Sequence, residues 1–316
     1  MDTYRGGLAV VTGGGTGMGR ELVRQLAAAG SDVAMCDVSA DNMAETARLV
    51  AEDGSGTTIT QHICDVSDEA QVVAFRDAVA AQHDTDTITV LFNNAGIGGA
   101  GSFVDDDRAA WERTFDVCWG GVYLCARAFM PMLVRSSDGA LVNTSSVNGF
   151  WASVGPDRPH TSYAASKFAV KGFTEALIAD FRVNAPHLSA HVVMPGHIGT
   201  SIALNSSTLH GGVDVTQVRK QLAARGLPAD QMSDEDIEAA MVAMGEQFRD
   251  NAPTSAAQAA TIILDAVLDG QWRILVGEDA HRLDDLVRDD PWDAYEPEYM
   301  DKILERGIFE AFPGRS

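Results

Sequence analysis

Short apolar runs alternate along this chain with longer amphipathic stretches. Continuous apolar runs are typical of parallel strands buried on both faces, and a period of about 3.6 residues indicates helices. Strands are predicted at Leu8–Thr12, Asp32–Asp37, Thr58–Ile63, Ile88–Phe92, Leu141–Thr144, Ala190–Met194 and Arg273–Val276. Helices are predicted at Met18–Ala29, Ala40–Glu52, Asp68–His83, Arg108–Arg135, Tyr163–Asn184, Val215–Ala224, Glu235–Phe248 and Ala256–Leu268. This order predicts an α/β fold: a single doubly wound Rossmann-type domain, with a seven-stranded parallel sheet and helices on both faces.

The alternation is interrupted after Thr200. Residues 201–254 contain a Gly-Gly pair, two prolines and an acidic stretch, and a helix and a strand follow them. Long insertions beside a sheet tend to be functional or mobile, so this segment is expected to form a lid. We therefore predict one domain over residues 1–280, with 201–254 as the lid, and an acidic and aromatic C-terminal extension over residues 281–316. Its aromatic residues, expected to cover an apolar patch on the same or a neighbouring subunit, are Trp292, Tyr295, Tyr299, Phe309 and Phe312.

Composition and charge favour a soluble globular protein over a membrane protein or a nucleic-acid-binding protein. The chain is 46% hydrophobic and 22% charged, as in ordinary soluble proteins with a large core. Its net charge of −22 disfavours binding to nucleic acids or anionic membranes, because phosphates need clustered basic residues. We see no apolar run near the roughly 18 residues of a membrane span, and no signal peptide. The four cysteines include no C-x-x-C pair, which favours a reducing, cytoplasmic location, and the eight histidines form no ligand-spaced cluster, so no metal is expected.

A glycine-rich turn separates the first predicted strand from the first predicted helix. It reads Thr12-Gly13-Gly14-Gly15-Thr16-Gly17-Met18-Gly19, with the pattern T-G-x-x-x-G-x-G. A pyrophosphate needs backbone N–H donors at a helix N-terminus and no side chains that block its approach, and glycines meet both needs. The strand–turn–helix context therefore predicts a dinucleotide site rather than a merely flexible loop.

Asp37 closes the second predicted strand, at a position where an acidic side chain can bond the adenosine ribose hydroxyls. A 2′-phosphate would be repelled by this carboxylate, and neither Thr16 nor Val38 supplies a cation. NAD is therefore the expected cofactor rather than NADP. The alternative for Asp37 is a helix N-cap or a turn residue.

Four further motifs follow the glycine turn in order. They are Asn93-Asn94-Ala95-Gly96, Ser145-Ser146, Tyr163-x-x-x-Lys167 and Pro195-Gly196-x-x-x-Thr200. Each alone is weak, but the five together resemble the short-chain dehydrogenase/reductase family in its single-domain form of about 250 residues. The resemblance covers roughly residues 5–277, apart from the segment after Thr200. It implies an oxidoreductase that assembles as a homodimer or homotetramer.

Tyr163 and Lys167 are spaced i, i+4, which puts both on one face of the predicted helix. Hydride transfer between a carbinol carbon and nicotinamide requires a proton to leave or enter the oxygen. Tyrosine, whose ordinary pKa is about 10, is a poor base unless positive charge favours its phenolate. The Lys167 ammonium and the oxidised nicotinamide would both bring the pKa of Tyr163 towards the working pH. The alternative is a half-buried aromatic residue beside a solvated lysine.

The resemblance also implies roles for the other motif residues. Ser146 would hold the substrate oxygen, and Lys167 would also bond the nicotinamide ribose. Asp65 and Val66 would recognise adenine. The residues implied around the cofactor are, besides Asp37, Val38, Tyr163 and Lys167, Thr12, Gly13, Gly15, Thr16, Gly17, Met18, Gly19, Asp65, Val66, Asn94, Ala95, Gly96, Pro195, Gly196, Ile198 and Thr200.

The sequence departs from the family pattern in two places. The stretch Trp111–Cys118 normally ends in an asparagine, the fourth catalytic member, which helps to hold a water between the lysine and solvent. A thiol is a weak donor and acceptor, so Cys118 is expected to impair this relay without abolishing the chemistry. Ser146 and Tyr163 are also further apart than usual, so residues 156–160 are expected to form a small insertion beside the pocket.

Apolar residues beside the motifs predict the substrate. These residues are Val147, Phe150, Trp151, Met194, Ile202 and Leu204. Each of them is expected to line the substrate pocket, and the alternative for each is ordinary packing in the core. An apolar secondary alcohol or its ketone, aromatic or alicyclic, is the expected small-molecule substrate. His160 is a candidate for the pocket entrance and His197 for a position near the nicotinamide, whereas His191 is expected to be structural.

The expected activity is NAD-dependent oxidation of this alcohol, because cellular NAD is mostly oxidised. One alternative is a carbonyl reductase that uses NADH. The other is a non-catalytic NAD-binding protein that retains the fold. Cys118 favours this alternative, because it stands where the family has a catalytic asparagine.

Overall fold

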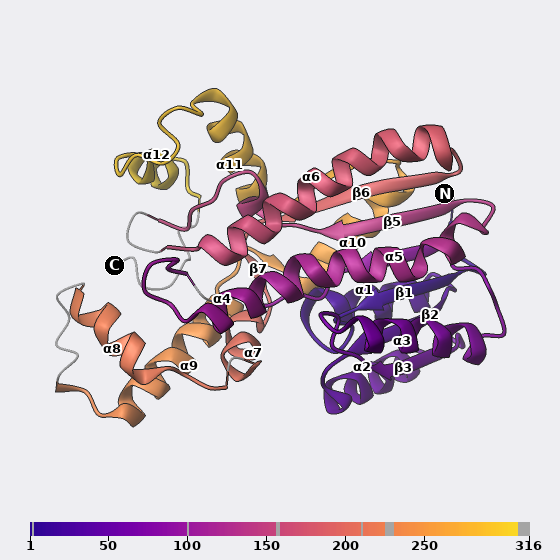
Figure 1. Ribbon diagram of the computed structural model, residues 1–316, viewed down its shortest axis with the longest axis horizontal. Coiled ribbons are helices and arrows are strands. Elements are labelled where there is room, and N and C mark those ends of the chain that lie inside the picture. The colour runs from indigo at the N-terminus through magenta and orange to yellow at the C-terminus, as the bar shows by residue number, and fades with distance from the viewer. Residues whose placement is uncertain (2, 100, 156–158, 210, 225–230, 309–316) are drawn as a thin grey trace.

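The computed structural model describes residues 1, 3–99, 101–155, 159–209, 211–224 and 231–308. Its main sheet has seven strands in the order β3-β2-β1-β4-β5-β6-β9, and every neighbouring pair is parallel (Figure 1). The strands are β1 (Leu8–Thr12), β2 (Asp32–Asp37), β3 (Ile59–Ile63), β4 (Val90–Asn93), β5 (Gly139–Thr144), β6 (Leu188–Pro195) and β9 (Arg273–Val276). The predicted doubly wound sheet is confirmed. Its strand order reverses between β1 and β4, and ligands of such sheets bind in the crevice at that point.

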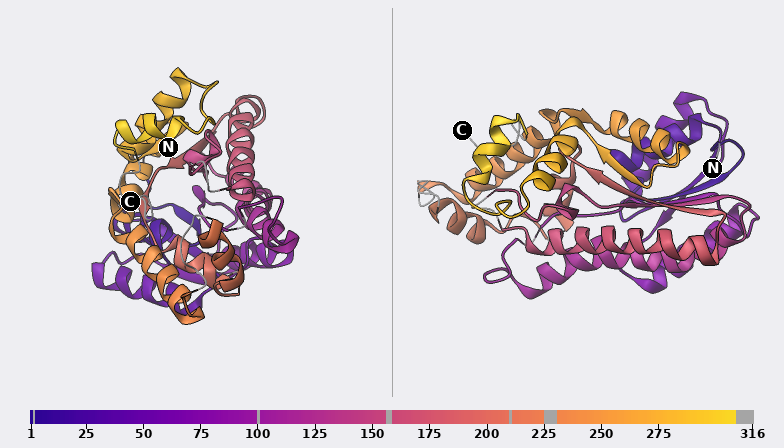
Figure 2. Two further views of the ribbon diagram at one scale, coloured as in Figure 1. Left: turned by 90° about the vertical axis from the view of Figure 1, so that its left-hand side faces the viewer. Right: turned by 90° about the horizontal axis from the view of Figure 1, so that it is seen from above.

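Helices cover both faces of the sheet (Figure 2). One face carries α1 (Gly17–Ala28), α2 (Ala40–Asp53) and α10 (Ala256–Leu268), and the other carries α3 (Glu69–Gln82), α5 (Gly121–Val134) and α6 (Thr161–Asn184). Successive β1 side chains alternate between the two cores: Ala9 and Val11 face the first, Leu8 and Val10 the second. All four are buried, which explains why the strand is a continuous apolar run.

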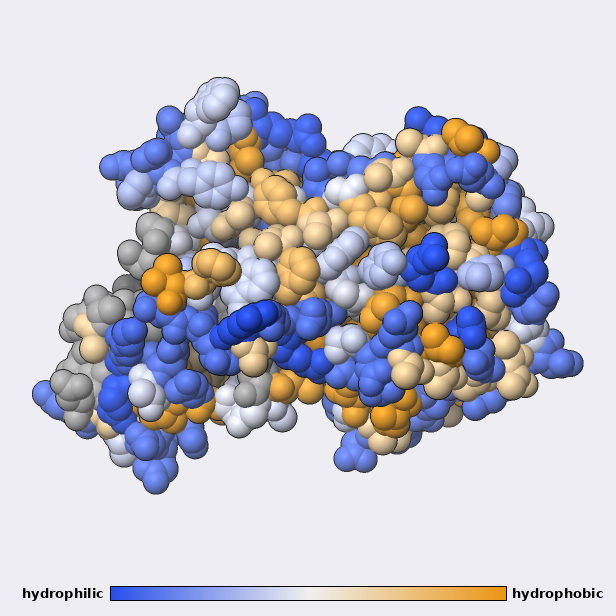
Figure 3. All heavy atoms as spheres, viewed as in Figure 1, coloured by the Kyte–Doolittle hydropathy of each residue, from blue (hydrophilic) through white to orange (hydrophobic). Residues whose placement is uncertain are grey.

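The predicted helix Arg108–Arg135 contains a change of helix type. α4 (Arg108–Phe115) and α5 are joined by a π-helical turn, η1 (Asp116–Gly120). The stretch 108–134 is long and apolar enough to cross a membrane, although the sequence shows no unbroken apolar run of that length. Half of its most apolar window is buried inside the fold, as is usual for a core helix. On the face shown in Figure 3, apolar side chains gather over α5 and α6, and Phe168 of α6 is 42% exposed.

The segment 201–254 leaves and rejoins the domain at one place. A short parallel pair, β7 (Ile198–Gly199) and β8 (Thr254–Ser255), joins its two ends. Its described part forms α7 (Ile202–Leu209), α8 (Val215–Ala224) and α9 (Asp234–Asp250), which project beyond the carboxyl edge of the sheet (Figure 1). This is the position that a lid over the crevice requires.

The C-terminal extension packs against the chain that follows β5. Helices α11 (Glu278–Asp289) and α12 (Tyr299–Glu305) form a third apolar core with Val147 and Trp151. The indole N–H of Trp151 donates to the carbonyl oxygen of Ala294 at 2.7 Å. The predicted domain boundary between residues 280 and 281 falls inside α11, because this helix begins directly after β9 and its apolar face belongs to the third core.

The aromatic residues of the extension divide into two groups. Tyr299 is 2% exposed and belongs to the third core, so the extension covers an apolar patch of its own subunit. Trp292 is 92% exposed and Tyr295 is 60% exposed, although the Tyr295 hydroxyl accepts a hydrogen bond from the main chain of the segment after β5. Phe309 and Phe312 lie outside the described residues.

Candidate active site

The glycine turn after β1 is shaped by contacts that leave no room for side chains. Gly13 and Gly17 have positive φ angles of 68° and 54°, which glycine adopts without strain. A Cβ atom on Gly13 would lie 2.9 Å from the Cα atom of Ala95, and one on Gly19 only 1.9 Å from the Gly13 carbonyl oxygen. The glycine pattern therefore reflects close packing of the backbone where the chain enters α1.

Thr12 and Asn94 tie this turn to the neighbouring strand. The Thr12 hydroxyl oxygen accepts hydrogen bonds from the backbone N–H groups of Asn94 and Ala95, both at 3.0 Å. The Asn94 amide donates to the Thr12 carbonyl oxygen at 3.2 Å. Because Thr12 is only 1% exposed, its predicted part in cofactor binding is indirect: it holds the ends of β1 and β4 together.

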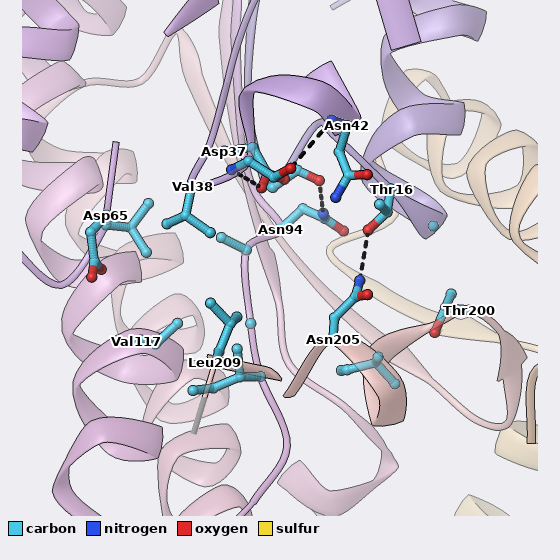
Figure 4. Close-up of a pocket in the computed structure, with 18 of the residues that line it drawn as sticks. Thr16, Asp37, Val38, Asn42, Asp65, Asn94, Val117, Thr200, Asn205 and Leu209 are labelled. Carbon is cyan, nitrogen blue, oxygen red and sulfur yellow. Dashed lines mark hydrogen bonds between the residues drawn. The ribbon is translucent and has the colours of Figure 1, made fainter. Parts of the chain in front are cut away.

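Asp37 lies at the end of β2 and faces the same crevice (Figure 4). One carboxylate oxygen accepts from the backbone N–H of Gly15 at 3.0 Å, and the other from that of Ser39 at 3.1 Å. These bonds fix the side chain at the cavity that it lines beside Val38. The N-cap of α2 is Ser39, which accepts from Asn42, so the N-cap alternative for Asp37 is wrong.

Asp65 lies beyond the end of β3 and is held by two neighbours. One carboxylate oxygen pairs with Arg113 of α4 at 2.7 Å, and the other accepts from the Ser67 hydroxyl at 2.7 Å. Burial raises the pKa of Asp65, but the hydrogen bonds from Arg113 and Ser67 outweigh burial, so the pKa lies below its ordinary value. Asp65 is therefore an ionised acceptor at this end of the cavity. No sequence motif singles out Arg113.

These side chains line one cavity of about 310 Å³ at the carboxyl edge of the sheet (Figure 4). The predicted cofactor residues in its lining are Gly13, Thr16, Gly17, Met18, Asp37, Val38, Asp65, Val66, Asn94, Ala95, Gly96 and Thr200. Lining residues that the sequence does not single out are Ser39, Asn42, Cys64, Ile97, Arg113, Val117, Asn205, Thr208 and Leu209. Asn205 of α7 donates to the Thr16 hydroxyl at 3.2 Å, so the inserted segment closes one side of the cavity.

A second cavity, of about 470 Å³, adjoins the first. The residues common to both linings are Met18, Asn94, Gly96, Thr200 and Ile202. Predicted residues that line the second cavity are Ser146, Tyr163, Lys167, Pro195, Gly196 and Ile198. The fold therefore brings the three predicted catalytic residues together next to the cavity that the glycine turn shapes. Gly15 and Gly19 support the turn without lining either cavity.

Tyr163 contacts both of its predicted partners. The Ser146 hydroxyl lowers the pKa of its phenol, and the Lys167 Nζ atom lies 5.2 Å from the centre of its ring. Lys167 is 3% exposed and donates to the Thr144 carbonyl oxygen at 2.9 Å. The phenol, the ammonium group and the serine hydroxyl thus lie together in one cavity, and the alternative of a solvated lysine is wrong.

Burial and positive charge act in opposite directions on Tyr163. Burial raises the pKa of the phenol, and this effect outweighs the lowering by the Lys167 ammonium and by the hydrogen bond from Ser146. The net pKa is above its ordinary value. Lys167 therefore acts in the predicted direction but does not by itself bring the pKa to the working pH.

The two neighbouring serines have different surroundings. Ser145 donates its hydroxyl to the Lys167 carbonyl oxygen at 2.7 Å and so ties β5 to α6. Ser146 begins the 3₁₀ turn η2 (Val147–Gly149), where its oxygen accepts from the Asn148 N–H at 3.1 Å. Both serines line the cavity that also contains Tyr163, but the Ser145 hydroxyl is already held by α6.

Cys118 lies in the π-helical turn and is completely buried. Its Sγ atom donates to the Ile97 carbonyl oxygen at 3.1 Å and accepts from the Ile97 N–H at 3.4 Å. Cys118 is absent from the described lining of both cavities. The thiol therefore fastens the chain after β4, and a direct catalytic contact of this side chain is not supported.

The apolar residues predicted beside the motifs are only partly in the substrate cavity. Val147 and Ile202 line it. Phe150 and Trp151 instead pack against the C-terminal extension, and Met194 is completely buried in β6. Leu204 faces a different cavity behind α7.

The three candidate histidines have different surroundings. His160 lines the second cavity with its ring 4.7 Å from that of Tyr163, and burial lowers the pKa of His160 to about 4. His197 is buried and absent from the described lining of the cavities, with Nε2 2.7 Å from the Phe248 carbonyl oxygen, and its place near the nicotinamide stays a prediction. His191 bonds the Gln271 carbonyl oxygen and is structural, as predicted.

Among the described residues, no group of three or more acidic, histidine or cysteine side chains could hold a metal ion. Of the predicted insertion, residues 156–158 lie outside the described residues.

Asp279 at the start of α11 binds the backbone of the segment between β6 and β7. One carboxylate oxygen accepts from the His197 N–H at 2.6 Å. A Cβ atom on Gly196 would lie 2.4 Å from this carboxylate, so the glycine is required for the close approach. Burial raises the pKa of Asp279 above its ordinary value. The sequence does not reveal this residue, because 82 positions separate it from His197.

Comparison with known proteins identifies the family. The family model for short chain dehydrogenases matches residues 7–209, which is more than half of the chain. The chain belongs to the short-chain dehydrogenase family. It is therefore an oxidoreductase with a Rossmann-type fold, and the resemblance seen in the five motifs is confirmed.

This short-chain dehydrogenase has relatives that match nearly its whole length. It is 32% identical over 288 residues to a putative oxidoreductase, SadH, from Mycobacterium tuberculosis, covering 91% of this chain and 92% of that protein. A short-chain dehydrogenase/reductase from Burkholderia phymatum, solved in complex with NAD, is 26% identical with a TM-score of 0.77, over 94% of this chain and 98% of that one. An alcohol dehydrogenase from Thermococcus sibiricus, complexed with 5-hydroxy-NADP, is 25% identical with a TM-score of 0.54, over 62% and 78%. Solved neighbours thus hold NAD or an NADP derivative.

Proposed function

We propose that this short-chain dehydrogenase is an NAD-dependent oxidoreductase that interconverts an apolar secondary alcohol and its ketone. The proposal rests on one observation: Ser146, Tyr163 and Lys167 line the same cavity, which adjoins the cavity at the glycine turn. A phenol with an ammonium group and a hydroxyl beside it is suited to moving a proton at an alcohol oxygen. The NAD-bound structure from Burkholderia phymatum supports the choice of cofactor.

The residues of the first cavity fit a dinucleotide. The turn around Gly13 and Gly17 has no side chains to block a pyrophosphate at the N-terminus of α1. Asp37 would bond the ribose hydroxyls, and the ionised Asp65 would accept from the adenine amino group. In the described lining of this cavity the one basic side chain is Arg113, which is already paired with Asp65. A 2′-phosphate would therefore meet the Asp37 carboxylate, and the described lining of this cavity offers it no further basic side chain.

NAD supplies the chemistry of hydride acceptance when it is bound, and the protein handles the proton. Ser146 would hold the alcohol oxygen, and Tyr163 would take its proton in oxidation or return one in reduction. Lys167 stabilises the phenolate form, since its ammonium lowers the pKa of the phenol. The cavity is lined mainly by apolar groups, which excludes water and favours an uncharged substrate.

The activity is tested by incubating the purified protein with NAD and a panel of secondary alcohols while NADH absorbance is recorded. We expect turnover of apolar members of the panel and little turnover of charged ones. Ketones with NADH form the reverse panel, and activity confined to that direction would favour the carbonyl reductase. Tight NAD binding without turnover in either panel would contradict the proposal and favour a non-catalytic NAD-binding protein.

Asp37 should decide the choice between NAD and NADP. Replacing Asp37 by Ser and Val38 by Arg in one variant removes the repulsive charge and adds a cation, while the serine can still accept from Ser39. We expect the ratio of kcat/KM for NADP to that for NAD to rise by roughly 10- to 100-fold, as for one or two charged hydrogen bonds. Val38→Ala is the matched control and should leave the ratio unchanged. An unchanged ratio in the double variant would place the ribose elsewhere.

A further inference from the structure

A third cavity, of about 320 Å³, lies between α7 and α9. It meets the substrate cavity at three residues that line both, Ala203, Ser207 and Phe248. Ala203 and Ser207 are one helical turn apart on α7. Phe248 belongs to α9, and its ring packs against His197 with ring centres 4.3 Å apart. These three residues of α7 and α9 therefore mark the boundary at which the substrate cavity meets the space behind α7.

The third cavity has an apolar lining. Its larger side chains include Leu204, Val213, Met241 and Met244, and no described residue of the lining carries a charge. Methionine is unbranched and adapts to ligands of different shape. The rim residue Val242 is 48% exposed, so the cavity reaches the surface on this side. A charged group would find no counter-ion here, whereas an apolar chain would gain by leaving water.

The ionisable groups of the substrate cavity lie at the opposite end. Its ionisable side chains are His160, Tyr163 and Lys167, and all three belong to the start of α6 or the residue before it. The side chains towards α7 and α9 are small or apolar. This polarity orients a substrate with its oxygen at Tyr163 and its apolar part towards Phe248.

We propose that the third cavity is a second compartment of the substrate site and takes the unbranched apolar chain of a long-chain secondary alcohol or ketone. The proposal rests on the proposed function. The chain would pass Ala203 and Phe248 and lie between α7 and α9. A Cβ atom on Gly245 would lie 2.6 Å from Leu204, so the glycine lets the two helices touch beside the compartment and sets its width.

The test compares a series of alkan-2-ols of increasing length, with NAD as cofactor, in three proteins. In the unchanged protein, kcat/KM should rise about fourfold for each methylene that enters the compartments. Met241→Trp fills the third cavity, and we expect it to lower the ratio of long-chain to short-chain kcat/KM at least tenfold. Ala240→Trp places the same ring on the exposed face of α9 and should leave the ratio unchanged.

The outcomes separate this inference from the proposed function. Turnover of short members with no gain on lengthening, or equal ratios in Met241→Trp and Ala240→Trp, would overturn the second compartment alone. If no alcohol is turned over, calorimetry still measures whether the long-chain alcohols bind to the protein. Length-dependent binding that Met241→Trp weakens would then support the compartment and contradict the reaction. Absence of both turnover and binding would overturn both.

Discussion

Replacing Tyr163 by Phe should lower kcat for alcohol oxidation by roughly 10²- to 10⁴-fold, the range for losing a general acid–base group. The variant keeps the ring that packs against His160 and Lys167 and loses only the hydroxyl. The proton of the alcohol then has no acceptor at the reacting oxygen. Steady-state kinetics with NADH absorbance measures the effect.

Two controls accompany this variant. NAD binding, measured by calorimetry, should change by no more than a few fold, because the first cavity is untouched. The melting temperature should stay close to that of the unchanged protein, because the ring and its packing remain. Retained turnover with intact folding would show that another group moves the proton.

Replacing Lys167 by Met should lower kcat/KM for oxidation at pH 8 by roughly a hundredfold. Burial already raises the pKa of Tyr163, and the Lys167 ammonium opposes that shift, so its removal moves the pKa further up. Oxidation needs the phenolate, whose fraction below the pKa falls about tenfold for each unit by which the pKa rises. The rising limb of the pH profile should therefore move to higher pH.

The reverse reaction distinguishes this tuning from a general loss of structure. Reduction needs the protonated phenol, which a higher pKa favours, so its rate should fall less than that of oxidation. Lys171→Met is the matched control one turn further along α6, where the lysine pairs with Glu175 away from both cavities. Equal losses in both directions, or an unshifted pH profile, would contradict the role of Lys167.

The sheet could be predicted from the sequence because its physical signal is local. Each strand is a short apolar run, since parallel strands buried on both faces have no solvent side. Strand ends were less well predicted: β4 begins at Val90 rather than Ile88, and β5 at Gly139 rather than Leu141. The π-helical turn at Asp116–Gly120 was missed, because one extra residue in a turn barely changes an apolar pattern.

The site was predictable where its residues form contiguous motifs. Tyr163 and Lys167 share one helix face, and the glycine turn carries its geometry in its own sequence. Arg113 and Asp279 act through contacts between distant segments, so no spacing rule reveals them. Apolar residues such as Trp151 fit a pocket lining and a core equally well, so the sequence alone does not place them. In the structure the C-terminal extension covers Trp151, which therefore belongs to a core.

The most direct test of the account is a crystal structure of the Tyr163→Phe variant with NAD and a slowly reacting secondary alcohol. We predict that the pyrophosphate lies on the glycine turn and that the alcohol oxygen bonds Ser146. The carbinol carbon should lie about 3–3.5 Å from the nicotinamide C4 atom, the separation of a reactive pair. A nicotinamide ring bound outside the cavity of Ser146 and Lys167 would contradict the account.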